Sequence, residues 1–211
     1  MASTIKVNTL DTQAGTDIAL AVGKNITGAN TQFKITGGAS GNILSTDGSG
    51  ALTWGAPSTA KISNLIQPTA ITGATASTTS ATFVDIAGLT VDITPSAATS
   101  KVLVFFSATI GANTGWHAHV RLMRDTTPIA IGDANGSRKQ STTETGHTAA
   151  IASPVCMMYL DDPATTSTTT YKLQWATEAT GTIYLNKSWT NTDNSNFGTF
   201  VSTITVMEVT A

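Results

Sequence analysis

Two histidines, His117 and His119, stand two residues apart in an expected strand that also contains Val120 and Leu122. Because side chains on a β-strand alternate between its faces, positions i and i+2 point to the same side. Two imidazoles on one face offer nitrogen ligands to a transition metal, and copies of the chain gathered around an axis would supply more of them. The alternative is a pair of exposed histidines opposite the core-facing Val120 and Leu122, or part of a polar pocket.

A second group of polar side chains lies in the stretch from residue 188 to residue 197. It combines one aromatic ring with amides and a carboxylate, namely Trp189, Asn191, Asp193, Asn194 and Asn196. Aromatic rings stack on sugar faces, and amide and carboxylate groups hydrogen-bond to sugar hydroxyls. These five residues are therefore the expected ligand-binding set. The alternative is an ordinary polar loop with one packed aromatic.

Other catalytic or metal-binding patterns are missing. Asp161 and Asp162 precede Pro163, but calcium takes six or more oxygen ligands and no Asp-x-Asp-x-Asp loop is present, so we expect them to cap a turn. The sequence has no nucleophile elbow, phosphate-binding loop, paired glutamate cluster or Cys/His zinc spacing. We therefore expect no enzymatic activity, and no cofactor other than an axial transition metal at His117 and His119. Two carboxylates brought together by folding, as in a glycan-degrading enzyme, stay open as an alternative.

The composition favours β-structure and excludes two classes of partner. Charged residues make up only 11% of the 211 residues and the net charge is −2, so no basic surface attracts nucleic acid or anionic membrane. Threonine and serine recur throughout, and threonine suits a pleated strand. The longest apolar run, residues 102–106, is too short to span a bilayer, and we see no signal peptide. The single cysteine, Cys156, is expected to be a small buried hydrophobe.

Residues 1–57 differ in kind from the rest of the chain. Short apolar alternations are separated by turn clusters rich in Gly, Asn and Asp, which predicts short strands joined by tight reversals. This segment holds too few apolar residues for a core of its own, so we expect identical copies to turn them toward a shared axis. The expected interface residues are Ile5, Val7, Leu10, Ile18, Leu20, Phe33, Ile35, Ile43, Leu44, Leu52 and Trp54.

Residues 58–211 show the pattern of a self-sufficient all-β domain, a β-sandwich of the jelly-roll kind. The expected strands are 62–66, 81–86, 89–93, 101–110, 116–124, 128–131, 154–160, 168–178, 181–186 and 199–209. Residues 101–106 are apolar on both faces. In a two-layer sandwich one face meets the opposite sheet, so the other face is expected to meet a neighbouring subunit.

Two runs near the N-terminus carry a resemblance to a known class of protein. The run Gly41-Asn42-Ile43-Leu44-Ser45-Thr46-Asp47-Gly48-Ser49-Gly50-Ala51-Leu52-Thr53-Trp54 resembles a motif of bacteriophage tail-fibre and related virion proteins. The opening Ser3-Thr4-Ile5-Lys6-Val7-Asn8-Thr9-Leu10 is similar to the start of many phage fibre proteins. The remainder resembles the C-terminal domains of marine-phage fibre-type proteins in residues 99–104, 119–125, 184–188 and 202–208.

This resemblance implies a short, extended and intertwined β shaft followed by the sandwich head, assembled as a homotrimer on a virion and made in the host cytoplasm. The implied partners are other virion proteins of the tail or capsid, and a host surface glycan or protein. Some phage fibre tips hold iron with a His-x-His pair from each of three chains, whereas here the pair lies in the middle of the head. The alternatives are a capsid decoration, head-fibre or tail-connector protein without a receptor, and a glycan-degrading fibre.

Overall fold

The computed structural model describes residues 39–46, 52–56, 62–73, 76–113, 115–146, 151–178 and 181–210. The chain divides into two compact units, Met1–Ser58 and Thr59–Ala211. Every regular element in the described residues is a β-strand, which confirms the all-β fold class. Within those residues no helix is long and apolar enough to cross a membrane.

The first unit contains two short strands, β1 (Ile43–Thr46) and β2 (Leu52–Gly55), which pair antiparallel. Leu44 lies opposite Trp54, and Thr46 lies opposite Leu52. Because alternate residues share a face, these side chains occupy one face of the two-stranded sheet. The strand pair therefore presents one side that is mostly apolar.

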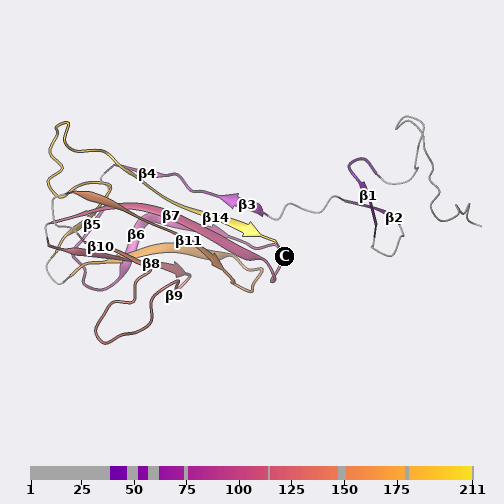
Figure 1. Cartoon of the computed structure of the whole chain (residues 1–211), viewed down its shortest axis with the longest axis horizontal. Coiled ribbons are helices and arrows are strands. Elements are labelled where there is room, and N and C mark those ends of the chain that lie inside the picture. Colours follow the sequence, from indigo (N-terminus) through magenta and orange to yellow (C-terminus); the bar gives the residue numbers. More distant parts are fainter. Residues whose placement is uncertain are drawn as a thin grey trace, which may run out of the picture. The chain divides into compact units, whose positions relative to one another are not determined.

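The second unit consists of two antiparallel sheets (Figure 1). The five-stranded sheet has the order β10 (Thr143–Gly146), β8 (His117–Arg124), β12 (Thr169–Ala176), β6 (Val84–Ile93), with β9 (Thr127–Ile129) paired to β8. The seven-stranded sheet contains β3 (Ile62–Ile66), β14 (Val201–Val209), β7 (Lys101–Ala112), β13 (Ile183–Leu185), β5 (Ser77–Thr78), β11 (Ala152–Asp161) and β4 (Ile71–Thr72).

The longest strand, β7, organises the seven-stranded sheet. β11 pairs with residues 102–111 of β7, β14 with residues 101–107 and β13 with residues 110–112. Since β11 occupies one edge of β7, β14 and β13 share the opposite edge in succession. β11 pairs with β7 alone among the described strands.

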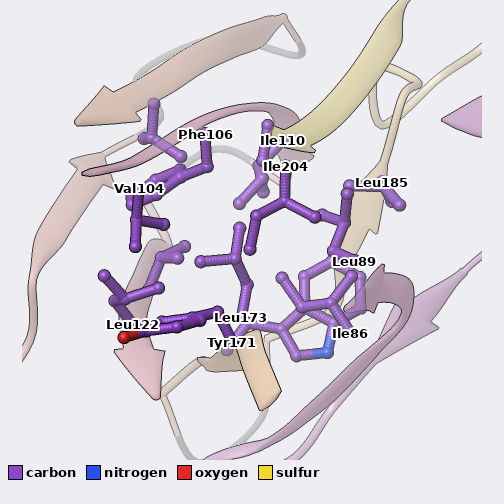
Figure 2. Packing of buried hydrophobic residues seen from close by; sticks show 14 of the residues in the cluster. Ile86, Leu89, Val104, Phe106, Ile110, Leu122, Tyr171, Leu173, Leu185 and Ile204 are labelled. Carbon is purple, nitrogen blue, oxygen red and sulfur yellow. The ribbon is translucent and has the colours of Figure 1, made fainter. Parts of the chain in front are cut away.

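The hydrophobic core fills the space between the two sheets. Figure 2 shows Phe106, Ile110 and Ile204 of the seven-stranded sheet facing Leu122 and Leu173 of the five-stranded sheet. Each of these side chains is buried, and each occupies the inward position of an alternating strand. Burial of such side chains is the main favourable term in folding, at about 1.5–3 kcal/mol each. The expected β-sandwich is therefore confirmed.

Two details of the strands differ from expectation. Residues 81–86 and 89–93 were expected to be separate strands with a turn at Ala87-Gly88, but β6 runs unbroken from Val84 to Ile93. Gly88 has a φ of 85°, and the pairing with β12 shifts register around it, so the turn signal marks a bulge. The strands β4, β5 and β10 were not expected, and the sequence of β10, Thr-Glu-Thr-Gly, has no apolar alternation.

Cys156 also departs from expectation. It was predicted to be a buried hydrophobe, but it is exposed on β11. The buried residue beside it is Val155, which faces the core. Both alternating faces of β11 are apolar, so the sequence did not show which face was inside. The prediction for Cys156 was wrong for that reason.

A buried carboxylate, Glu208 of β14, fixes the loop that follows β6. Its Oε1 accepts a hydrogen bond of 2.7 Å from the backbone N–H of Ser96 and another from the Ser96 hydroxyl. Its Oε2 accepts a hydrogen bond of 3.4 Å from the Ser63 hydroxyl of β3. Burial acts to raise the pKa of Glu208, but hydrogen bonds from serine donors, with the Ser96 hydroxyl first among them, outweigh it and hold the pKa below its ordinary value.

Glu208→Gln is expected to lower the free energy of unfolding by about 1–2 kcal/mol at neutral pH, because the serine donors lose a charged acceptor. Since the pKa of Glu208 is lowered in the folded state, this stabilisation is present above the unfolded-state pKa and disappears as the pH falls through the folded-state pKa. Urea unfolding at neutral and at acidic pH measures both effects. A difference between variant and parent that does not shrink in acid would contradict the assignment.

Candidate functional site

The predicted ligand-binding loop begins at a buried polar anchor. Asn186, at a φ of 59°, donates a hydrogen bond of 2.8 Å from Nδ2 to the Ile71 carbonyl. Its Oδ1 accepts a hydrogen bond of 2.7 Å from the Ser202 hydroxyl of β14. The Ser202 hydroxyl in turn accepts the backbone N–H of Thr109 at 3.0 Å. These bonds fix the point at which the chain leaves β13, and so position the loop that follows.

The loop forms two small hollows that share Phe197 and Gly198. Asn191, Asp193 and Asn194 line one hollow of about 210 Å³, which brings three of the five predicted residues together. Asn196 lines the second hollow, of about 200 Å³. Ligand sites for drug-sized molecules are usually about 300–1,000 Å³, so each hollow accommodates only a small polar group.

Trp189, the fifth predicted residue, lies apart from both hollows. Its ring centroid is 5.8 Å from that of Tyr184, with the planes inclined by 56°, and the residue is 40% exposed. The Lys187 ammonium lies 4.3 Å from the centre of the same Tyr184 ring. Trp189 is therefore half packed against its neighbour, with one part of the ring open to solvent.

The loop is internally ordered by its own short-range hydrogen bonds. The backbone N–H of Asn191 donates to the Ser188 hydroxyl at 3.2 Å, and that of Asn196 donates to Asn194 Oδ1 at 2.9 Å. Asn191 adopts a φ of 39°, which asparagine tolerates better than most residues. The Asn194 side-chain oxygen, one of the groups predicted to bind a ligand, thus forms a hydrogen bond within the loop instead. What remains exposed can accept and donate hydrogen bonds to hydroxyl groups.

His117 and His119 lie on the outward face of β8, as predicted, opposite the buried Val120 and Leu122. The two rings are edge to face, with centroids 6.4 Å apart. His117 Nδ1 lies 2.7 Å from Glu178 Oε1.

His119 has a carboxylate neighbour of its own. Its Nδ1 is 3.1 Å from Glu144 Oε2. Burial lowers the pKa of His119, and the charge of Glu144 opposes this shift only in part. Beside it is an open hollow of about 460 Å³, lined by His119, Ser137, Arg138, Lys139 and Glu144.

With the other described residues of one chain, the histidine pair does not complete a metal centre. No group of three or more His, Cys, Asp or Glu side chains suited to a metal ion occurs among the described residues. Each Nδ1 is turned toward a carboxylate, an arrangement that in metal sites orients the imidazole while Nε2 binds the ion. The axial transition metal shared by several chains stays a prediction, and elemental analysis of the purified protein tests it.

Asp161 has a different role from the turn cap that the sequence suggested. It is buried at the end of β11, and its Oδ2 accepts a hydrogen bond of 2.6 Å from the Tyr171 hydroxyl of β12. Arg124 Nη1, on β8, lies 3.0 Å from the same oxygen. Burial, together with the hydrogen bond to Asp161, raises the pKa of Tyr171 well above its ordinary value. Asp161 therefore links the two sheets.

Four of the predicted subunit-interface residues lie in the described part of the first unit. Leu44, Leu52 and Trp54 share one face of the β1–β2 sheet, whereas Ile43 points to the other face. Ile43, Leu52 and Trp54 are exposed within the single chain. The other predicted interface residues, Ile5, Val7, Leu10, Ile18, Leu20, Phe33 and Ile35, lie outside the described residues.

Comparisons with known proteins identify no family. No family model matches the sequence, and no curated protein matches it. A structure of infectious bursal disease virus, Gx strain, is similar over 80% of this chain and 41% of its own, with 11% identity and a TM-score of 0.36. The VP2 subviral particle of infectious bursal disease virus is similar over 70% of this chain and 37% of its own, with 13% identity and a TM-score of 0.32.

This chain thus spans less than half the length of either viral protein. The strand order and pairing of the chain itself define its β-sandwich fold.

Proposed function

We propose that this chain is a non-enzymatic structural protein of a bacteriophage particle, a homotrimer whose N-terminal segment is the assembly device. The observation that carries the proposal is the run from residue 41 to residue 54. It resembles a phage fibre motif in sequence, and its two ends form β1 and β2, paired antiparallel with an apolar face left exposed.

The β1–β2 sheet is too small to be stable alone. A two-stranded sheet in water is marginally stable at best, and additional strands or packing against another element is needed. Leu44, Leu52 and Trp54 provide an apolar face that copies of the chain would bury against one another. The number three is supplied by the resemblance to phage fibres, in which such segments intertwine.

The head supplies the surfaces for contact beyond the trimer. The partners we propose are other virion proteins of the tail or capsid, and a host surface glycan that the loop around Asn191 and Asp193 contacts through its amides and carboxylate. Binding of host polysaccharide that Asp193→Ala abolishes would support this role. A chain that binds no host component, but is incorporated in the capsid or tail, would instead be a decoration or connector protein.

A structural role agrees with how three of the described carboxylates are used. Asp161 bonds Tyr171 and Arg124, and Glu208 bonds two serines. Asp85 lies 2.8 Å from the Lys172 ammonium, which lowers the pKa of Asp85. These three groups hold strands and loops together, whereas a glycosidase needs two carboxylates free to act on either side of a glycosidic bond.

The full-length protein is expected to sediment as a trimer at micromolar concentration. The double variant Leu52→Ser, Trp54→Ser should weaken the trimer at least about tenfold in dissociation constant, because each copy loses buried apolar surface. Val84→Ser, which removes an exposed apolar residue from the five-stranded sheet, is the matched control and should leave the mass unchanged. A wild-type protein that stays monomeric throughout would disprove the proposal.

A further inference from the structure

The seven-stranded sheet carries an apolar surface on the side away from the core. In β7 the buried residues Val102, Val104 and Phe106 alternate with Leu103 and Phe105, which point outward. Register extends this outward surface over the neighbouring strands. We call it the outer face and define it by Leu103, Phe105, Met158, Leu160, Met207 and Leu65.

The strand register places these side chains next to one another. Phe105 lies opposite Met158, and Leu103 lies opposite both Leu160 of β11 and Met207 of β14. Residues directly opposite in antiparallel strands point to the same side of the sheet. Leu65 of β3 lies in the bulge opposite Met207. Leu65 is 65% exposed and Met158 is 67% exposed, so the apolar row reaches both margins of the sheet.

Charge is almost missing from the outer face. The strands β3, β7, β11 and β14 contain three charged residues, Lys101, Asp161 and Glu208. Asp161 and Glu208 point inward and are buried, so only Lys101, at the end of β7, is exposed.

The five-stranded sheet provides the contrast within the same domain. Its outward surface carries a polar network in which Lys172 bonds Asp85 at 2.8 Å and Arg121 donates to Gln174 Oε1 at 2.7 Å. That surface has the composition of a sheet face in contact with water. The outer face of the seven-stranded sheet has the composition of a buried one, although Phe105, Met158 and Leu65 are exposed on it.

The sheet surface that contains the outer face is large enough for a protein interface. Alongside residues 101–107 of β7, the strands β3, β14 and β11 complete a surface that spans roughly 400 Å² in projection, polar positions included, at about 4.8 Å between strands and about 3.3 Å per residue. Two such faces in contact would remove on the order of 1,000 Å² from water, near the lower limit for a specific interface. Soluble monomers rarely expose contiguous apolar patches beyond a few hundred Å².

We propose that a second copy of this chain packs on the outer face, and that the outer face turns toward the neighbouring heads in the assembled protein. This inference rests on the proposed function, which requires association of copies. A flat surface without charge offers nothing to select an acidic or basic partner. Outer faces gathered around the axis of a trimer can meet without burying an unpaired charge.

Cys156 is a natural reporter for this contact. It is the only cysteine in the sequence, it lies opposite Ser107 on the outward side of β11, and it is exposed in the single chain. In the assembled full-length protein, Cys156 is expected to react with a maleimide at least about tenfold more slowly than an exposed thiol, because the partner copy covers it. The matched control is Cys156→Ser combined with Val84→Cys, which moves the thiol to the five-stranded sheet.

Two substitutions that each introduce a charge test the same surface, with the mass of the assembly measured by sedimentation. Leu65→Glu and Met158→Lys are each expected to weaken association at least about tenfold by sedimentation, because the interface would bury an unpaired charge. Thr90→Glu is the control, because Thr90 is exposed opposite Lys172 on the outward side of the five-stranded sheet, and it should leave association unchanged. Both substituted residues are highly exposed in the single chain, so thermal unfolding followed by circular dichroism should show that the heads remain folded.

The outcomes separate this inference from the proposed function. If the protein is an oligomer, Cys156 reacts slowly with the maleimide and Leu65→Glu weakens association, both the outer-face contact and the proposed function are supported. An oligomer in which Cys156 reacts as fast as the thiol at position 84, and which Leu65→Glu leaves intact, overturns the outer-face contact while the proposed oligomer stands. A monomer with a fast Cys156 overturns both. A monomer with a slow Cys156 shows that another segment of the same chain covers the face, which overturns packing by a second copy.

Discussion

Replacing Asp161 with alanine is expected to lower the free energy of unfolding by about 3–4 kcal/mol, because it removes the acceptor of a buried ion pair. Asp161 Oδ2 accepts the Tyr171 hydroxyl at 2.6 Å and lies 3.0 Å from Arg124 Nη1. Tyr171 is fully buried, so its hydroxyl would keep no protein partner and gain no water in exchange. The Arg124 side chain is 28% exposed and can recover some hydration, which places the loss toward the lower end of the range for buried pairs.

Chemical unfolding at a fixed protein concentration measures the effect, since association also contributes to stability. The matched control is Asp162→Ala. Asp162 is exposed, and it contacts Arg124 through its backbone carbonyl, which alanine retains. The control is expected to stay within about 0.5 kcal/mol of the parent. If Asp161→Ala and Asp162→Ala were equally mild, Asp161 would not be the link between the sheets that the geometry indicates.

The strands were predictable wherever one face of the strand is clearly more apolar than the other. The predicted stretch 168–178, in which Tyr171, Leu173 and Trp175 alternate with polar residues, contains β12, and the alternating stretch 199–209 contains β14. In β11 both faces are apolar, and the inward side is set by pairing with β7, a contact between segments far apart in the sequence. The exposure of Cys156 depends on that pairing, which is why sequence alone misplaced it.

For the candidate sites, too, contacts between neighbours in the sequence could be predicted, whereas contacts between distant segments could not. Asn191, Asp193 and Asn194 come together because they are neighbours in one loop, so their grouping could be predicted. The carboxylates beside the histidines could not, because Glu144 and Glu178 reach His119 and His117 only through strand pairing and chain return. Likewise, the hydrogen bond between Ser96 and Glu208 joins residues 112 positions apart, and no local sequence pattern predicts it.

Gly111→Val is expected to lower the free energy of unfolding by about 3 kcal/mol, at the upper end of what overpacking costs. Gly111 lies in β7, and a Cβ at this position would be 2.1 Å from the Lys187 carbonyl oxygen and 3.0 Å from Ser188 Cα. Both contacts are with backbone atoms, so no side-chain rotation relieves them. Glycine here allows the segment that leads into the Trp189 loop to pass directly over the strand.

The direction of the change in stability distinguishes a close backbone approach from ordinary strand preference. Valine favours strands and glycine weakens them, so without the close approach Gly111→Val would leave stability unchanged or raise it. Gly132→Ala is the matched control, since a Cβ there would meet nothing within 4 Å, and it should be close to neutral. Urea unfolding compares the two variants. Because the clash displaces residues 187 and 188, Gly111→Val should also disturb the hollow around Asn191, and host-polysaccharide binding should fall with stability. A stable Gly111→Val protein would show that the loop is not held against β7.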